Sequence, residues 1–407
     1  MEIDFSKPFM IFSGDNGTGK TYAASLLFSM LDNVFLKLLT CKELDEVFQP
    51  TKMLKSGEDG KINCDKLYDL VKRNLSSEKE IIARLLDLNI PTDKFGIEVL
   101  TTNEQFAEDV KQMEVNVGGL IKKRAGSLVY NLRRSLGTSE VDILWKADFG
   151  CGLFFDGRWK SHMLTAERGG IYTFSKEIAV GRLRNPDSAR SYPYPIGMSL
   201  AHAEDLKRLK ENQGCLADLC PEIEDEVLHG KLKVGDEGEV LLSVSDNQDL
   251  SINQVASAVK TLSPLVFYLR HLSGYCSFLI IDEPELNLHP KNQVLLAKLF
   301  VKMVNAGAKL LISTHSDYII REINNAVMAH SLTNLGDEAA QAKGYDKSLC
   351  LDPEQLAPYI FEESKGKVKV RPLEVDNFGF SMPSIDETID KQNEVTNEFY
   401  ELLKYAH

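Results

Sequence analysis

Two short segments, far apart in the chain, carry residue types that could together bind and hydrolyse a nucleotide. The first, GDNGTGKT at residues 14–21, fits the phosphate-loop pattern G-x-x-x-x-G-K-[ST]. In that pattern backbone N–H groups surround the phosphates, the lysine neutralises β- and γ-phosphate oxygens, and the threonine hydroxyl reaches Mg²⁺. The residues expected to bind ATP phosphates are Gly14, Asp15, Asn16, Gly17, Thr18, Gly19, Lys20 and Thr21.

The second segment is an apolar run that ends in two carboxylates, Asp282 and Glu283. Asp282, with Thr21, can hold the metal, and Glu283 can polarise the attacking water as a general base, an effect worth roughly 10²–10⁴-fold in rate. Taken alone, the pair could also be a solvent-exposed acidic turn. The phosphate loop upstream favours the catalytic interpretation, in which Glu283 and Lys20 are catalytic residues.

A third polar group follows the next expected strand, at Ser313-Thr314-His315-Ser316. Carboxyl ends of neighbouring parallel strands lie at the same edge of a sheet, so His315 is expected beside the same phosphates. An ionisable group there can respond to the γ-phosphate. The alternative is a histidine that caps the following helix.

Regular elements flank these segments as the chemistry requires. Phe9–Phe12 is an apolar strand before the phosphate loop, and a helix begins at about Tyr22 after it. Alternating helix and strand patterns from residue 254 onward indicate a parallel sheet. Further strands are expected at 163–166, 231–234, 239–244, 278–282, 309–313, 359–362 and 368–375. Further helices are expected at 65–73, 78–88, 103–136, 198–212, 216–228, 254–272, 291–305, 317–324 and 386–405.

We therefore expect an α/β fold in which an ATPase head is interrupted by a largely helical insertion. The expected parts are the first piece of the head (1–40), the helical insertion (41–137), a mixed α/β lobe with hairpins (138–250) and the second piece of the head (251–407). One hairpin is expected at 141–155. The prolines at 193 and 195 are expected to stop regular structure.

Composition is that of a globular protein with an acidic balance. The 407 residues carry a net charge of -13, so no global positive field attracts nucleic acid or anionic lipid. Basic clusters such as Lys122-Lys123-Arg124 and Arg133-Arg134 leave a local nucleic-acid-binding groove open, although a solvated helix face is the simpler interpretation.

Cysteine usage and the N-terminal sequence both favour a cytoplasmic protein. Seven cysteines occur without the spacing of a disulfide framework, which favours a reducing compartment. The chain begins without a basic signal-peptide region, and the apolar run that starts at Tyr22 is interrupted by polar residues. We expect no membrane association.

In this order, the motifs resemble those of ABC-class ATPases of the SMC and OLD type. Residues 284–290, PELNLHP, are similar to the D-loop segment of that class, and His315 falls at its switch-histidine position. Residues 256–263 occupy the place of the signature motif, which in these dimers donates a serine to the partner's γ-phosphate. The resemblance implies ATP and Mg²⁺ as cofactors, a homodimer or higher oligomer formed through the ATP site, and Ser257 as the donated serine.

The signature-like segment departs from the usual motif, because Ala258 and Val259 stand where two glycines are expected. Their side chains would limit close backbone approach to a phosphate. The contact across the dimer is then looser, or depends on Ser257 and Lys260. Ser257 as an ordinary helix N-cap is the alternative.

The resemblance extends to a prokaryotic subgroup that pairs an ATPase with a separate effector in anti-phage defence, as Septu- and PARIS-like systems do. Residues 163–171, MLTAERGGI, are similar to its PAER-x-G segment, with Thr165 in place of proline. Arg168 in this segment could contact phosphate or brace the loop. The sequence after His315 lacks the acidic clusters of the OLD-type Toprim nuclease, so a nuclease or toxin partner is expected on another polypeptide.

Two other classes of function remain open. A DNA-repair or chromosome-maintenance ATPase would act directly on DNA and would bind it with strong salt dependence. A binding module would hold ATP as a structural ligand with little turnover. A transporter subunit fits less well, because the signature is degenerate and the insertion is large.

Overall fold

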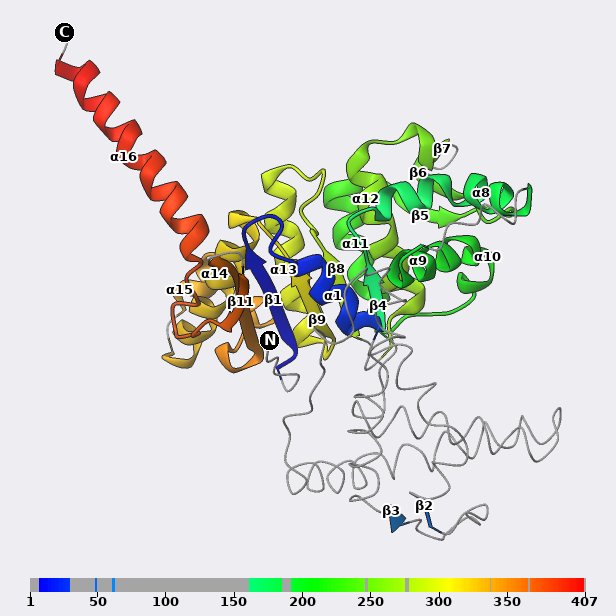
Figure 1. Cartoon of the computed structure of the whole chain (residues 1–407), viewed down its shortest axis with the longest axis horizontal. Helices are drawn as coiled ribbons and strands as arrows, with labels where there is room; N and C mark the ends of the chain where they lie inside the picture. The colour runs from blue at the N-terminus through cyan, green and yellow to red at the C-terminus, as the bar shows by residue number, and fades with distance from the viewer. Residues whose placement is uncertain are drawn as a thin grey trace. The chain divides into compact units, whose positions relative to one another are not determined.

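The computed structural model describes residues 7–29, 48–49, 61–62, 161–184, 192–245, 248–274, 278–336, 338–364 and 367–405 (Figure 1). The helices expected between residues 65 and 136, the hairpin expected at 141–155 and both internal basic clusters lie outside these residues. The chain divides into two units. Unit 1 comprises residues 1–25, 162–190 and 195–407, and unit 2 comprises residues 26–161 and 191–194.

A six-stranded sheet forms the centre of unit 1, with strand order β11-β10-β1-β9-β8-β4. β1 pairs in parallel with both β9 and β10, β8 pairs in parallel with β9, and β11 is antiparallel to β10. The strands are β1 (Phe9–Gly14), β4 (Ser161–Leu164), β8 (Phe278–Asp282), β9 (Lys309–Ser313), β10 (Leu356–Ser364) and β11 (Lys367–Pro372).

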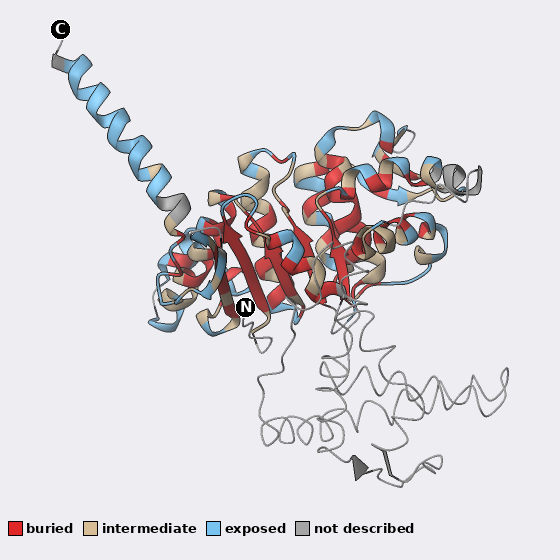
Figure 2. Ribbon diagram, in the orientation of Figure 1, coloured by how far each residue is buried: buried red, intermediate tan, exposed pale blue. Residues whose placement is uncertain are grey.

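Burial of the central strands explains their composition. Every residue of β1 and β8 is buried, and all but those at their carboxyl ends are apolar, as expected for strands covered on both faces. Figure 2 shows these strands as the buried centre of the unit. The register pairs Asp282 with Ser313 and Phe12 with Ser313, so the carboxyl ends of β1, β9 and β8 lie at one edge.

The helices alternate with the strands along the chain. They are α1 (Lys20–Ser29), α8 (Arg168–Arg184), α9 (Tyr194–Glu204), α10 (Leu206–Leu209), α11 (Cys220–Ile223), α12 (Ser257–Phe267), α13 (Pro290–Asn305), α14 (Asp317–Asn334), α15 (Ala339–Ala342) and α16 (Pro383–Tyr405). α13 and α14 pack against each other, and α8 packs against α12.

A three-stranded antiparallel sheet follows α11 in the chain. It consists of β5 (Lys231–Val234), β6 (Val240–Ser245) and β7 (Gln248–Ser251). The hairpin β5–β6 confirms the prediction from the four-residue polar loop. β7 was not expected, because its sequence QDLS lacks an alternating apolar pattern.

Several helix predictions were wrong in their bounds. The helix expected at 254–272 is α12 flanked by a 3₁₀ turn (Ile252–Gln254) and a π turn (Tyr268–Leu272). Pro195 does not stop regular structure but lies in the first turn of α9, where its missing N–H is not needed. α14 continues to Asn334 rather than ending at Asn324, because its apolar face continues into the core.

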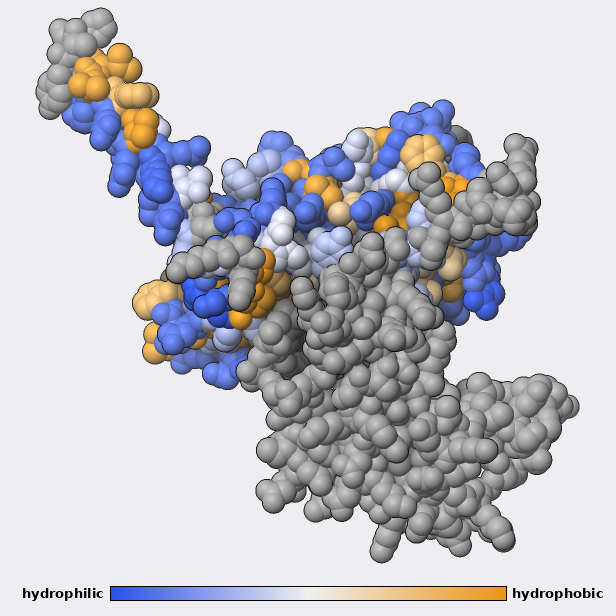
Figure 3. Space-filling model, viewed as in Figure 1, coloured by the Kyte–Doolittle hydropathy of each residue, from blue (hydrophilic) through white to orange (hydrophobic). Residues whose placement is uncertain are grey.

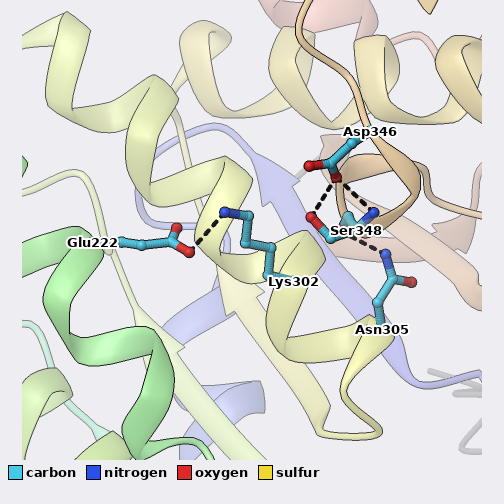
Figure 4. A network of polar contacts seen from close by, with 5 residues as sticks. All are labelled: Glu222, Lys302, Asn305, Asp346 and Ser348. Atoms are coloured by element: carbon cyan, nitrogen blue, oxygen red, sulfur yellow. Dashed lines mark hydrogen bonds and ion pairs between the residues drawn. The ribbon is translucent and has the colours of Figure 1, made fainter. Parts of the chain in front are cut away.

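Polar contacts fix α13 between two neighbouring segments (Figure 4). Lys302 Nζ donates to Glu222 Oε1 of α11 at 2.7 Å, and Asn305 Nδ2 donates to Ser348 O at 2.9 Å. Asp346 accepts from the backbone N–H and the hydroxyl of Ser348, which closes the turn that receives Asn305. These contacts join the C-terminal turns of α13 to α11 on one side and to the 346–348 turn on the other.

The C-terminal helix α16 is exposed over most of its length (Figure 2). Its last turns carry apolar side chains in solvent, among them Phe399 and Leu403 at 62% and 67% exposure, and Figure 3 shows this apolar end. Among the described residues, no helix combines the length and apolar character needed to cross a membrane.

Candidate functional site

The phosphate loop connects β1 to α1 and has the backbone shape that its glycines permit. Gly14 has φ of 133°, and a Cβ there would lie 2.2 Å from the carbonyl oxygen of Phe361. Gly17 and Gly19 also have positive φ, at 80° and 88°. The Thr18 hydroxyl donates to Asp15 O at 2.8 Å and closes the loop from inside. The loop between β1 and α1 is therefore stabilised by its own contacts.

Lys20 begins α1 and turns its side chain back over the loop. Its Nζ donates to Gly14 O at 3.0 Å and to Asp15 O at 2.8 Å, and the residue is 6% exposed. Burial lowers the pKa of Lys20, while the charges of Glu283 and Asp282 raise it. An ammonium group has three N–H donors, so one remains for a phosphate oxygen in this position.

Thr21 and Asp282 meet although 261 positions separate them in the chain. The Thr21 hydroxyl donates to Asp282 Oδ1 at 3.2 Å, and the Ser313 hydroxyl donates to the same oxygen. Burial raises the pKa of Asp282, and these two hydrogen bonds lower it. The Ser313 contact was not expected from sequence; the only indication was a hydroxyl at the end of the neighbouring strand.

The residues present fit a magnesium ion. Asp282 is 1% exposed, and within the described part of the chain its Oδ2 has no hydrogen-bond partner. A buried carboxylate oxygen without a partner is costly. Carboxylate and hydroxyl oxygens are the hard ligands that Mg²⁺ prefers, usually one or two from protein together with phosphate and water. Thr21 and Asp282 provide that donor set.

Glu283 follows the strand end in a backbone conformation that only a minority of residues adopt. Its φ is 47°, in the left-handed region, and its N–H donates to Ser313 O at 3.0 Å. Burial and the neighbouring Asp282 charge raise the pKa of Glu283, which Lys20 and Arg168 oppose. A carboxylate with a raised pKa, half-buried beside a phosphate loop, has the properties of a general base.

His315 lies on the phosphate-loop side of the same edge. Burial lowers its pKa first, followed by the positive charge of Lys20, while Asp15 raises it. Its backbone N–H donates to Glu285 Oε1 at 2.7 Å. The alternative role as a helix cap is wrong, because Ser316 is the N-cap of α14 and accepts from Ile319 N.

Glu285 is a site residue whose role the sequence did not reveal. Its two carboxylate oxygens accept from the His315 backbone N–H and from the Thr314 hydroxyl, at 2.7 Å and 2.9 Å. Burial raises the pKa of Glu285, and these hydrogen bonds lower it. Glu285 therefore joins the segment after β8 to the segment after β9 and fixes the backbone at His315.

Arg168 braces the site rather than pointing to a phosphate. The residue is 3% exposed, and it donates hydrogen bonds to the backbone oxygens of Thr165, Thr261, Asp282 and Glu283. Burial lowers the pKa of Arg168 to about 10, against the raising effect of Glu285 and Asp282. Of the two roles open from sequence, the structure favours bracing.

Ser257 is the first residue of α12, and its side chain is exposed. The N-cap is Ala256, without a side-chain capping bond, so the alternative of Ser257 as an N-cap is wrong. Among the described residues, no hydrogen bond or ion pair joins Ser257 to the phosphate loop. The structure thus brings together Lys20, Thr21, Asp282, Glu283 and His315, and places Ser257 on a separate, outward-facing helix end.

Comparison with known proteins gives a family match to part of the chain. Residues 201–320 match the family described as AAA ATPase domain. This segment contains Asp282, Glu283 and His315 but not the phosphate loop. No curated protein matches the chain. With the strand–loop–helix at Gly14 and the parallel central strands, the chain has an α/β P-loop ATPase fold, as expected.

Solved structures of Smc heads are similar to this chain at low identity. The Smc head bound to the C-winged helix domain of ScpA has a TM-score of 0.36 and 12% identity, covering 92% of each chain. The Pyrococcus furiosus Smc head domain with an extended coiled coil, bound to the C-terminal domain of ScpA, has a TM-score of 0.32 and 13% identity. It covers 97% of this chain and 94% of that chain.

Proposed function

We propose that this protein hydrolyses ATP with Mg²⁺ in the manner of an ABC-class ATPase. The observation that carries the proposal is that the hydroxyls of Thr21 and Ser313 both donate to Oδ1 of Asp282 at the end of β8. Glu283 follows Asp282 directly in the chain. A phosphate loop alone would support nucleotide binding only. The adjacent carboxylates of Asp282 and Glu283 add a metal ligand and a general base that can activate water.

Each residue of the site has a distinct role in this proposal. The loop residues from Gly14 to Gly19 bind phosphates through backbone N–H groups, and Lys20 neutralises the β- and γ-phosphates. Thr21 and Asp282 hold Mg²⁺, which when bound offsets the charge that develops on the phosphate oxygens. Glu283 accepts a proton from the attacking water, and His315 contacts the γ-phosphate.

We further propose that ATP binding joins two heads. Ser257 is exposed at the start of α12, where the positive end of the helix dipole lies. In a dimer, the N-terminus of α12 would contact the γ-phosphate of the nucleotide bound to the other head. Each γ-phosphate site would then be completed by two chains. Ala258 and Val259 make the contact looser than one built with glycines.

The output of this assembly is proposed to be the sensing of phage infection or the control of a separately encoded nuclease or toxin. Support comes from the family resemblance of residues 163–171 and 284–290 and from the acidic net charge of -13, which disfavours a DNA-tracking surface. Direct action on DNA as a repair or chromosome-maintenance ATPase is the alternative.

Steady-state ATP hydrolysis by the full chain tests the proposal. We expect Mg²⁺-dependent turnover that duplex DNA does not increase. Tight ATP binding without turnover would favour a module that holds ATP as a structural ligand. Turnover raised by DNA, with steeply salt-dependent binding, would favour the alternative. For the defence role, phage plating on cells that express this protein and its neighbouring gene should drop, and Lys20→Ala should restore it.

A further inference from the structure

Arg168 links two elements that the proposed chemistry treats separately. From the first turn of α8, its Nε donates to Thr261 O in α12 at 3.2 Å. Its Nη1 and Nη2 donate to Asp282 O at 2.7 Å and to Glu283 O at 2.9 Å. A guanidinium group presents five N–H donors in a rigid plane, so it can hold several carbonyls at fixed separations. The end of β8 and the middle of α12 are thereby tied through one side chain.

Asn287 makes a second link between the same elements. Its Nδ2 donates to the Thr261 hydroxyl at 3.2 Å, from the turn that follows Glu283. That turn is closed by Leu286 N, which donates to Glu283 O at 3.2 Å. Thr261 is therefore contacted through its backbone by Arg168 and through its side chain by Asn287.

Thr261 lies four positions after Ser257 in α12. Residues four apart share a helix face, separated by about 6 Å along the axis. Ser257 is exposed at the end of the helix, whereas Thr261 is 3% exposed. A displacement of the N-terminus of α12 would therefore move Thr261 as well, because one turn of hydrogen-bonded helix joins them.

The backbone conformation of Glu283 is sensitive to such a displacement. A non-glycine residue in the left-handed region persists only where its surroundings stabilise that conformation. For Glu283, whose φ is 47°, the holding contacts are its N–H bond to Ser313 and its carbonyl contacts with Arg168 and Leu286. A shift of Arg168 would therefore alter the backbone that aims the Glu283 carboxylate.

We propose that Arg168, Thr261 and Asn287 form a relay that aligns Glu283 for catalysis when a neighbouring subunit contacts the N-terminus of α12. Arg168 is a positioning residue in this relay, because it touches the carbonyl and not the carboxylate of Glu283. The relay rests on the proposed function, since it needs both ATP hydrolysis and a contact at Ser257. With this relay, a single subunit binds nucleotide, but fast hydrolysis requires a second subunit to contact α12.

Substitutions at Thr261 and Asn287 test the relay with little disturbance of the core. Thr261→Val removes the hydroxyl at nearly constant volume, and Thr261→Ser keeps it. Asn287→Gly removes the amide without strain, because Asn287 has φ of 60° and glycine adopts that conformation readily. Asn287→Asp keeps the shape of the side chain but lacks the N–H that donates to the Thr261 hydroxyl. Thr333→Val, on exposed α14 surface, is the matched control.

We expect Thr261→Val and Asn287→Gly to lower kcat about tenfold, because small displacements of a catalytic group are costly. Their Kd for a fluorescent ATP analogue should stay within about twofold of wild type, since the phosphate loop is untouched. Turnover per subunit of the wild type should rise with protein concentration as subunits assemble, and this rise should be smaller in both variants. Thr261→Ser should retain both kcat and the rise, whereas Asn287→Asp should lose them as Asn287→Gly does. Arg168→Lys should also lose them, because one ammonium cannot span from α12 to the end of β8.

Two results overturn the relay alone while wild-type turnover persists. One is wild-type kcat and concentration dependence in Thr261→Val and Asn287→Gly. The other is a loss of kcat in Thr261→Ser as large as that in Thr261→Val, which would indicate a purely structural role. Wild-type protein without turnover would instead overturn the proposed function, and the relay with it.

Discussion

The Thr21 hydroxyl and Oδ1 of Asp282 lie 3.2 Å apart, across 261 positions of sequence. β1 and β8 are not neighbours in the sheet, because β9 lies between them. The contact therefore reaches across the end of β9, where Ser313 donates to the same oxygen. Among the described residues, the buried Oδ2 of Asp282 has no hydrogen-bond partner, so it is available to a metal.

Asp282→Asn should separate metal binding from the fold. The amide keeps an oxygen that can accept from Thr21 and Ser313, so unfolding temperature should change little. The negative charge is lost, and the Mg²⁺ concentration needed for half-maximal ATP binding should rise about tenfold or more. Titration of Mg²⁺ at fixed ATP measures this, with Glu211→Gln as an exposed-carboxylate control. An unchanged Mg²⁺ requirement would remove Asp282 from the metal site.

Gly14→Ala should destabilise the protein by roughly 2–4 kcal/mol, combining backbone strain with a backbone clash. The new Cβ would lie 2.2 Å from Phe361 O, at a φ of 133°. Gly197→Ala is the contrasting variant, because a Cβ there meets nothing within 4 Å and the residue lies in α9. It should be neutral or stabilise the helix by about 0.5–1 kcal/mol. Urea unfolding of both variants checks the difference, and equal effects would contradict it.

Ser257→Arg should weaken ATP-dependent assembly without lowering ATP affinity for the single head. The larger charged side chain would occupy the exposed end of α12, where a neighbour's nucleotide is expected. Light scattering with ATP and Mg²⁺ should show a dimer for wild type and a monomer for the variant. A dimer of equal mass and stability in the variant would count against the contact across the interface.

Cys220 should resist alkylation in the folded protein. Burial raises its pKa to about 11, and the residue is 2% exposed. At pH 8 about one thiol in a thousand is then ionised, and the thiolate is the reactive form. Iodoacetamide labelling followed by peptide mass spectrometry should modify half-buried Cys215 before Cys220. Rapid modification of Cys220 at pH 8 would show that its surroundings open readily.

Elements with a strong local pattern could be predicted from sequence. The bounds of β8 and β9 match the expected 278–282 and 309–313, because each is a short apolar run ended by polar residues. The strand and helix around the phosphate loop follow equally directly from their motif. The start of the helix around Ser257 was placed too early, at 254 rather than at Ser257, because the preceding 3₁₀ turn has a similar local pattern.

The contacts that support the site could not be predicted in the same way. Arg168 contacts carbonyls up to 115 positions away, and nothing in the local sequence specifies which ones. Glu285 joins two strand ends through hydrogen bonds that exist only once β8 and β9 pair. Similarly, β7 has too few apolar residues to be recognised before its partner β6 is in place.

Comparison of wild type with Glu283→Gln tests the central claim most directly. Glutamine keeps the shape of the side chain but cannot accept the proton of the attacking water, so Mg²⁺-dependent hydrolysis should fall about 10²-fold or more. Affinity for ATP should be retained, because Lys20 and the loop remain, and the ATP-bound dimer should accumulate. Near-normal turnover in Glu283→Gln would contradict its role as the general base and the account of the site built on it.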